Sequence, residues 1–471
     1  MPNILIRAHK SPFQTASAEQ TISHNLLGRN AGNLIFSQAV CRLLSTEQTN
    51  VRTANLASLD TLRNGRWRGE PVDRLVLPLA NAFRPDYLDR LHRMTKIIKQ
   101  AGIPVTVLGV GAQAALDGRR RAAARLDHAV SDFVRTVLRE ATGPIGVRGE
   151  YTREYLSRLG FRGDEVQVIG CPSMFMYGPD LKITKAAPEL SFDAPIALNI
   201  SPYVRQMGPL SQRHATRYPK LIYIGQNEAT LELLITGRYP AKPGSSTFTS
   251  GVPVTVDHPL IEQDRVRFFL DPTPWIDHLR DYQFSFGTRI HGNIAALLAG
   301  TPAVVLAHDS RTRELADYHR IPTRLITDRP DGIDAAELYR SADWQPLNDG
   351  HLERWRVFES FLHQHGLPTS YDDGEDRGAA FDARLASLDF PPAVRTPLGA
   401  SAEELFAMRG ELAELRRELQ TVRQRLSASE QASRRRIDSE IVRLINAGRR
   451  LPPVANARRL AGDVRSRLAA R

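Results

Sequence analysis

The sequence predicts an α/β protein with two doubly wound domains, followed by a C-terminal coiled-coil helix. Short apolar runs alternate with amphipathic stretches over about the first 330 residues, which is typical of parallel strands covered by helices. A segment of weak periodicity, residues 177–194, divides this alternation into two series. Beyond residue 400, apolar residues recur alternately three and four apart, which is the spacing of a heptad repeat.

Residues 1–176 form the predicted N-terminal α/β domain. Between its apolar runs, apolar residues recur three or four apart, as in helices that pack on a sheet. We expect its strands at Asn3–Ile6, Arg74–Leu79, Val105–Gly109, Ile145–Val147 and Glu165–Ile169. We expect its helices at Asn33–Leu44, Pro85–Ala101, Ala129–Glu140 and Glu150–Leu159.

Residues 195–330 form the predicted C-terminal α/β domain. We expect its strands at Pro195–Ile200, Lys220–Gly225, Arg265–Leu270, Phe284–Phe286 and Ala303–Ala307. We expect helices at Pro274–Arg280, His291–Ala299 and Arg311–Tyr318, and loops at Arg205–Pro219 and Tyr239–Pro253. Two such Rossmann-like domains would bind ligands in the cleft at the C-terminal ends of their strands. Residues 331–390 predict a closing helical segment that packs back on the body.

The region after the linker Pro391–Gly399 predicts a coiled coil at residues 401–427. Ser401-Ala-Glu-Glu404 has the form of a capping box at the start of a helix. Three heptads follow, with apolar residues at Leu405, Met408, Leu412, Leu415, Leu419, Val422 and Leu426. We expect a homo-oligomer joined through Leu405–Leu426, and the alternative is one amphipathic helix that lies on the body.

The tail, residues 428–471, is basic. The net charge is +11, and about +7 of it lies beyond residue 400. The heptads break at Ser427–Ser433, and Ile437, Ile441, Leu444 and Ile445 then form an apolar stripe bordered by arginines. Such a stripe suits an anionic membrane surface. A solvated basic tail, or a helix that docks on a partner, accounts for it equally.

Several classes of protein are excluded by composition. No window approaches the ~18 uncharged apolar residues of a membrane span, and Arg7 and Lys10 interrupt the N-terminus before a signal peptide could form. We therefore expect a cytoplasmic protein, with any membrane contact peripheral and at the inner face of the plasma membrane. Aromatic residues do not alternate with basic ones, so no nucleic acid is expected.

Neither the two cysteines nor any known ligand pattern predicts a metal site. Cys41 and Cys171 are too far apart in the sequence for a metal knuckle or a redox pair. We expect both to be buried thiols. No paired CxxC, HExxH or EF-hand pattern occurs, so we expect no metal.

The sharpest motif is the segment Phe286–Leu306. A strand ends near Gly287, Arg289 and His291 follow on the turn, and a helix of small residues comes next. A guanidinium binds a carboxylate or phosphate through two hydrogen bonds, and helix-start amides favour an anion. The motif predicts an anionic substrate with His291 as general acid beside it. The alternative is that both side chains only cap the turn.

Two further candidate cleft residues follow predicted strands. Gln113 ends the segment Gly109-Val-Gly-Ala-Gln113, which lacks the third glycine of a dinucleotide fingerprint, so we expect no NAD. Asp309 follows the strand Ala303–Ala307 and either faces the cleft or caps the next helix.

Four segments together resemble the polysaccharide pyruvyl transferase family. Arg289-Ile-His291 with Gly300-Thr-Pro302 is similar to the family's Arg-x-His turn and Gly-(Thr/Val)-Pro strand. Asn30-Ala-Gly-Asn33 stands where the family often has Asn-x-Gly-Asp. Further likenesses are Gly102–Gln113 and the segment from Ile145 through Arg148 to Pro172.

The resemblance implies transfer of the pyruvyl group of phosphoenolpyruvate to two hydroxyls of a saccharide, as a cyclic ketal, with release of phosphate. It implies a GT-B-like fold and a role in exopolysaccharide or glycolipid biosynthesis for the cell envelope. Arg148 and Arg289 would hold the donor's carboxylate and phosphate from opposite domains, and His291 would protonate its methylene carbon. The donor is a substrate, and no cofactor is expected.

Two residues depart from the family's pattern. Asn33 and Cys171 stand where aspartate is common, which removes two candidate carboxylates, and no residue is identified as a general base. The alternatives are a nucleotide-sugar-dependent glycosyltransferase of the same architecture and a non-catalytic scaffold for glycan assembly. The first needs a pocket for a base and a diphosphate that the sequence does not plainly show. The second does not need Arg148, Arg289 and His291 together.

Overall fold

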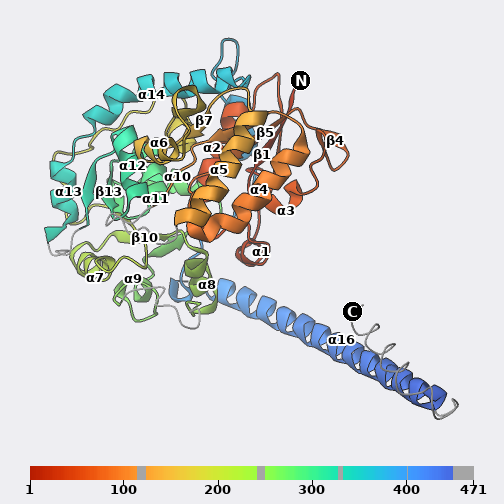
Figure 1. The fold of residues 1–471 in the computed structure, drawn as a ribbon. Coiled ribbons are helices and arrows are strands. Elements are labelled where there is room, and N and C mark those ends of the chain that lie inside the picture. Colours follow the sequence, from red (N-terminus) through yellow and green to blue (C-terminus); the bar gives the residue numbers. More distant parts are fainter. Residues whose placement is uncertain (114–122, 241–249, 327–331, 400, 449–471) are drawn as a thin grey trace. The chain divides into compact units, whose positions relative to one another are not determined.

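The computed structural model of the chain describes residues 1–113, 123–240, 250–326, 332–399 and 401–448 (Figure 1). The chain divides into two units, Met1–Gly399 and Ala400–Arg471. Among the residues described, no helix combines the length and the apolar character that a membrane span requires.

The first sheet is parallel throughout. Its strands, in spatial order, are β2 (Asn50–Ala54), β1 (Asn3–Arg7), β5 (Arg74–Pro78), β6 (Val105–Leu108), β7 (Ile145–Val147) and β8 (Val166–Val168). A bridge between Val110 and Val147 continues the sheet from β6 to β7. A small antiparallel hairpin, β3 (Arg66–Trp67) and β4 (Glu70–Pro71), lies outside it.

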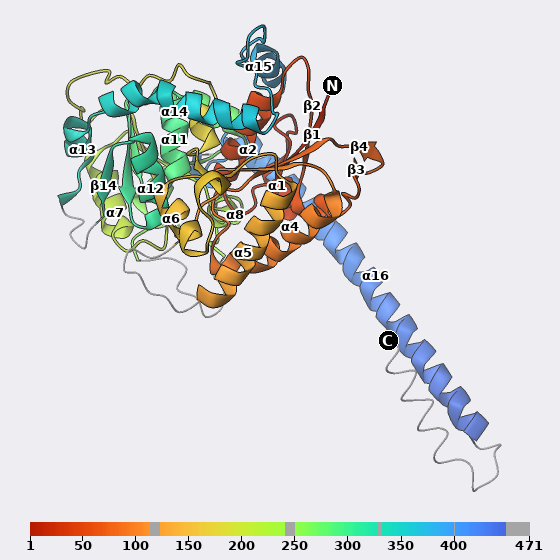
Figure 2. The ribbon, with the colours of Figure 1, turned by 45° about the horizontal axis from the view of Figure 1, so that its top comes forward.

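The helices around this sheet bury one apolar face each. Leu91, Met94, Ile97 and Ile98 recur three or four apart and are buried in α4 (Leu88–Ala101), as a helix that packs on a sheet requires. Figures 1 and 2 show α4 and α5 (Ala123–Glu140) side by side. The other helices and 3₁₀ turns are α1 (Ala18–Ser23), α2 (Gly32–Leu44), α3 (Leu56–Leu59), η1 (Pro85–Tyr87), α6 (Glu150–Arg158), η2 (Gly163–Glu165) and η3 (Pro172–Phe175).

The second sheet is also parallel and is doubly wound. Its strands, in spatial order, are β11 (Val266–Phe268), β10 (Leu221–Gly225), β9 (Ile196–Asn199), β12 (Phe284–Gly287), β13 (Ala303–Ala307) and β14 (Thr323–Leu325). The chain reverses its winding between β9 and β12, and ligands of such sheets bind at this switch point.

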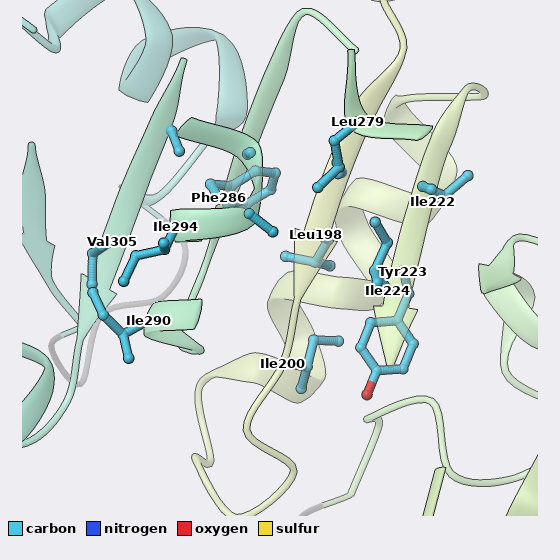
Figure 3. Close-up of a cluster of buried hydrophobic side chains, with 14 of the residues drawn as sticks. Leu198, Ile200, Ile222, Tyr223, Ile224, Leu279, Phe286, Ile290, Ile294 and Val305 are labelled. Atoms are coloured by element: carbon cyan, nitrogen blue, oxygen red, sulfur yellow. The ribbon is translucent and has the colours of Figure 1, made fainter. Parts of the chain in front are cut away.

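Helices cover the second sheet on both faces. Ile290 and Ile294 of α11 (Ile290–Leu298) lie near Val305 of β13 in the buried apolar cluster of Figure 3. Because nearly every residue of α11 is buried, this helix is held rigidly behind the end of β12. The other helices are α7 (Met207–Arg217), α8 (Glu228–Thr236), α9 (Pro259–Glu262), α10 (Pro272–Leu279) and α12 (Ser310–His319).

The closing segment returns from the second sheet to the first. It comprises α13 (Ala335–Ser341), α14 (Gln345–Gln364) and α15 (Ala379–Ala386). Figure 2 shows α14 running from α13 toward α15 and the N-terminal strands. Trp355, Phe358 and Phe361 of α14 share one core with Ile4 and Ile6 of β1. The segment therefore packs back on the body, as its sequence predicts.

Buried polar contacts fix the two sheets relative to each other. The ammonium of Lys10, three residues after β1, pairs with the carboxylate of Asp271 before α10. The Glu314 carboxylate of α12 accepts hydrogen bonds from Thr152 of α6, at 2.6 Å from its backbone nitrogen and 3.1 Å from its hydroxyl. Since these groups are buried, the contacts hold the cleft in one geometry.

Several elements differ from those that the sequence predicts. Arg205–Pro219 is expected to be a loop but contains α7, because the proline of Gly208-Pro209 lies in the first turn, where a helix tolerates it. The strands β2 and β14 and the helix α8 are not anticipated by the sequence analysis. Part of the predicted loop Tyr239–Pro253, residues 241–249, lies outside the described residues.

In its described part, residues 401–448, the C-terminal unit contains one helix, α16 (Ala402–Gly448). The helix continues through Ser427–Ser433, where the heptads break, because a polar residue on the seam interrupts packing but not helical hydrogen bonds. The coiled coil and the function of the tail stay predictions. Arg449 and Arg450, which border the predicted apolar stripe, lie outside the described residues, as does the remainder of the chain.

We expect Lys10→Met to lower the free energy of unfolding by about 3–5 kcal/mol, because it leaves the buried Asp271 carboxylate without its partner. Urea unfolding followed by circular dichroism measures this loss. Lys10→Met combined with Asp271→Asn should recover part of it, since the second change removes the uncompensated charge. Equal stability of Lys10→Met and the parent protein would contradict a structural role for the pair.

Candidate active site

A cavity of about 500 Å³ opens at the C-terminal ends of strands from both sheets. Its walls follow directly on β1, β5, β7, β10 and β12, the edge where parallel sheets bind ligands. The charged side chains that line it are mostly basic: Arg7, Arg29, Arg84, Arg90, Arg148, Arg289 and Arg311, against Asp86 and Asp89. The cavity therefore suits an anionic ligand.

Arg148 enters the cavity from the end of β7 and is 2% exposed. Its backbone is fixed by a hydrogen bond from its nitrogen to the Val110 oxygen, at 3.0 Å. Its Nε is buried and has no hydrogen-bond partner among the described residues. A Cβ at Gly111 would lie 1.9 Å from this Nε, so the chain must be glycine there. A buried guanidinium with a free donor is a strong site for an anion.

Arg289 enters from the second sheet, between β12 and α11. Its backbone nitrogen donates to Asn199 Oδ1 at 2.7 Å, and its guanidinium donates to Asn227. The guanidinium also lies 5.7 Å from the centre of the Tyr203 ring. Arg311 of α12 donates to the Tyr203 hydroxyl at 3.2 Å. Tyr203 thus holds Arg289 and Arg311 in one place, opposite Arg148.

His291 lies in the first turn of α11, between these arginines. Its Nε2 is 3.8 Å from the Cys171 sulfur, and its ring stands edge-on to Phe36. Burial lowers the pKa of His291 to about 3, with further contributions from the charges of Arg148 and Arg311. Burial also raises the pKa of the Cys171 thiol. At neutral pH, both His291 and Cys171 are therefore uncharged.

Asn33, at the start of α2, supports a loop of the cavity wall. Its Nδ2 donates to the Leu27 and Gly28 oxygens at 2.9 and 3.3 Å. A carboxylate at this position would face two carbonyl oxygens without a proton to donate. The amide therefore fits this loop, whereas a carboxylate would leave both carbonyl oxygens without their donor. A Cβ at Gly32 would lie 2.7 Å from the His291 Cβ.

Gln113 and Asp309 stand behind the cavity wall and are not among its lining residues. Gln113 accepts a hydrogen bond from Asn81, which lines the cavity, at 2.7 Å. Asp309 caps α12 by accepting from the Thr312 nitrogen and pairs with Arg311 at 2.9 Å. The sequence leaves open whether Asp309 faces the cleft or caps the helix, and the structure shows the cap.

Other residues of the cavity are not identified by the sequence analysis. They include Arg7, His9, Arg84, Tyr87 and Arg90. Arg311 also lines the cavity, although the sequence predicts it only as the first residue of a helix. Arg7 is the last residue of β1, and His9 follows two residues later. This position at the end of a predicted strand can be recognised in the sequence. Arg84, Tyr87 and Arg90 lie around η1 and the start of α4, where only the tertiary structure brings them to the cavity.

The structure shows the state of both cysteines and the arrangement of the side chains that could hold a metal ion. Cys41 and Cys171 are buried and free, as expected. Within the described part of the chain, no three His, Cys, Asp or Glu side chains gather where they could hold a metal ion. That the protein uses no metal stays a prediction.

We expect Cys171→Asp to raise the pKa of His291 from about 3 by about 1–3 pH units, because a carboxylate beside the ring favours the imidazolium. The protonated fraction of His291 at pH 5 should then increase. An NMR titration of the histidine rings measures this change, with His291→Asn used to assign the signal. Cys171→Ser is the neutral control, and an unchanged pKa in Cys171→Asp would contradict the contact.

Solved structures resemble the chain at low sequence identity. The UDP-GlcNAc 2-epimerase of Methanocaldococcus jannaschii is 11% identical with a TM-score of 0.40, over 77% of this chain and 100% of that chain. The UDP-GlcNAc 2-epimerase of Neisseria meningitidis is 11% identical with a TM-score of 0.37, over 82% and 100%. Nothing about the site follows from similarities at this level. No curated protein matches the sequence.

A family model does match the chain. The model of the polysaccharide pyruvyl transferases covers residues 30–310, which contain the switch point of the second sheet and the residues Arg148, Arg289 and His291. The matched range is more than half of the 471 residues. The chain therefore belongs to the polysaccharide pyruvyl transferase family.

Proposed function

We propose that the protein transfers the pyruvyl group of phosphoenolpyruvate to two hydroxyls of a saccharide, as a ketal, in the biosynthesis of a cell-envelope glycan. The observation that carries the proposal is the convergence of Arg148, Arg289 and Arg311 around His291 in one cavity. Phosphoenolpyruvate carries a carboxylate and a phosphate, and guanidinium groups from opposite sides of the cavity match these two anions.

The donor's two anionic groups have separate partners in this proposal. Arg148 offers a buried Nε with no partner among the described residues, whereas Arg289 and Arg311 are held by Tyr203. Each guanidinium presents donors in a planar fork that fits a carboxylate or phosphate. Because these side chains are positioned before the ligand arrives, binding needs little rearrangement.

The donor also supplies the charge that His291 needs to act as an acid. The protein itself keeps this imidazole neutral, since burial and the charges of Arg148 and Arg311 lower the pKa of His291 to about 3. A bound trianion neutralises those guanidiniums and favours the imidazolium. We therefore expect the donor to bind together with a proton.

The reaction balances with these groups. The imidazolium of His291 gives a proton to the methylene carbon, and one acceptor hydroxyl attacks the adjacent carbon as it becomes cationic. The bond from that carbon to the phosphate oxygen then breaks, and phosphate leaves with the electron pair. The second hydroxyl forms the second C–O bond. The two hydroxyl protons pass to His291 and to the departing phosphate, which leaves as hydrogen phosphate.

We expect Arg148→Gln and Arg289→Gln each to weaken the binding of phosphoenolpyruvate about 10- to 100-fold, since a hydrogen bond to a charged group contributes about 1.5–3 kcal/mol. Isothermal titration calorimetry measures the affinity, and repetition in buffers of different ionisation enthalpy measures proton uptake. His291→Asn should retain binding but lose the uptake. Arg313→Gln is the matched control, because Arg313 is an exposed residue of α12 outside the cavity lining.

The same titration includes a nucleotide sugar as competitor. Binding of the nucleotide sugar without phosphoenolpyruvate would overturn the proposal in favour of a glycosyltransferase. Binding of neither compound would favour a non-catalytic scaffold. Where phosphoenolpyruvate binds, release of inorganic phosphate on addition of candidate saccharides identifies the acceptor.

A further inference from the structure

The cavity holds a second group of arginines, gathered around Tyr87. The Arg7 guanidinium donates to the Tyr87 hydroxyl at 3.2 Å. The guanidinium carbons of Arg84 and Arg90 lie 5.6 and 5.4 Å from the centre of the same ring. We call Arg7, Arg84 and Arg90 the Tyr87 cluster. All three residues line the cavity, and none has a part in the donor site proposed above.

The Tyr87 cluster faces the donor site inside the same cavity. It comes from the end of β1 and from the region of η1 and α4, whereas Arg289 and Arg311 come from the second sheet. Both groups line the same cavity of about 500 Å³. A ligand bound at the cluster would therefore lie next to the donor.

Among the described residues, the carboxylates that line the cavity are those of Asp86 and Asp89, against the three guanidinium groups of the Tyr87 cluster. The nearby Asp86 side chain is 72% exposed, so solvent screens its ion pair with Arg84. His9, which contacts Arg7 at 3.4 Å, contributes no negative charge. The Nε of Arg7 is buried without a hydrogen-bond partner in the part of the chain that is described. The cluster is thus an incomplete electrostatic site that an anion would complete.

We propose that the Tyr87 cluster binds a diphosphate group carried by the saccharide acceptor. This inference rests on the proposed function, because the acceptor hydroxyls must reach the donor within the cavity. Guanidinium groups bind phosphate oxygens in pairs, and three of them around one ring suit a diphosphate better than a single carboxylate. A nucleoside diphosphate sugar and a prenyl diphosphate saccharide share this chemistry.

The test is calorimetric titration of the full chain with inorganic pyrophosphate, in the presence of saturating phosphoenolpyruvate. We expect pyrophosphate to bind beside the donor. Arg84→Gln combined with Arg90→Gln should weaken pyrophosphate at least tenfold and leave the affinity for phosphoenolpyruvate within about twofold. Arg93→Gln is the control. Arg93 lies on α4, as Arg90 does, but it pairs with Asp60 and is not in the cavity lining.

Each outcome decides between the two proposals. Competition between pyrophosphate and phosphoenolpyruvate, or unchanged pyrophosphate affinity in the double variant, would overturn the second site. Binding of glucuronate without pyrophosphate would overturn the diphosphate. Pyrophosphate binding that depends on Arg84 and Arg90 without any binding of phosphoenolpyruvate would retain the anion site and overturn the pyruvyl donor. Titration with UDP-GlcNAc and with farnesyl diphosphate then distinguishes the two sources.

A separate observation concerns the apolar stripe of α16. Leu412, Leu415 and Leu419 are 54, 50 and 50% exposed in the single chain, and Val422 and Leu426 continue the same heptad spacing. These residues occupy the two core positions of a coiled coil. Over residues 411–423, the charged residues that flank the stripe follow one order. Glu411 and Glu418 each stand directly before a core residue. Arg416 and Arg423 each stand directly after a core residue.

We infer that this stripe joins two copies of the chain in a parallel and in-register coiled coil. In that arrangement each flanking residue meets the partner's residue five positions further along, so Glu411 faces Arg416 and Glu418 faces Arg423. An antiparallel pair would place glutamate against glutamate and arginine against arginine. Charge complementarity therefore selects the parallel orientation and a second copy as occupant.

Cysteine cross-linking of the full chain tests the orientation. Leu405→Cys should form a disulfide between two copies under mild oxidation, because residue 405 lies opposite itself in a parallel pair. An antiparallel pair would instead bring residue 405 of one copy to residue 422 of the other, so a disulfide that requires Leu405→Cys together with Val422→Cys would overturn the inference. Changing Glu411 and Glu418 to arginine should lower the oligomer fraction in analytical ultracentrifugation. A monomeric parent protein at micromolar concentration would also overturn it.

Discussion

Mutual repulsion among arginine side chains is the constraint that the structure around the cavity must satisfy. Among the residues that the structure describes, seven guanidinium groups and two carboxylates line one cavity. Two like charges 4 Å apart repel by about 4 kcal/mol at an effective dielectric constant of about 20. Such a group persists only where rigid elements hold each side chain and where neighbours absorb part of the charge.

The fold meets this constraint in two ways. Tyrosine rings collect the arginines into two groups, Tyr203 on the side of the second sheet and Tyr87 on the side of the first. Asp309 neutralises part of the charge of Arg311 from behind the wall. The buried contacts of Lys10 and Glu314 then keep the two sheets from separating under the repulsion. The positive charge that is left over is available to ligands.

Burial and the same charge together determine the protonation of His291. A catalytic acid usually needs a pKa near the working pH, but burial, with the charges of Arg148 and Arg311, lowers the pKa of His291 to about 3. In many enzymes a carboxylate beside the histidine corrects this, whereas here the neutral Cys171 thiol occupies the adjacent position. The missing negative charge has to come from the substrate. The proposed mechanism therefore couples proton uptake to donor binding. Because His291 is neutral until the donor binds, it does not act as an acid before then.

The sequence by itself determined most strands and helices, the Arg-x-His turn and the heptads, because each depends on residues that are close together along the chain. Edge strands such as β2 and β14 were missed, since their polar residues are half-exposed or exposed and carry no apolar run. Arg289 and His291 belong to one short motif after β12, and Arg148 belongs to a segment that resembles the family, so the sequence indicates all three. Only the tertiary structure decided that Arg7, Arg84 and Arg90 share one ring and face Arg311, because these residues come from separate segments whose meeting depends on how the two sheets pack.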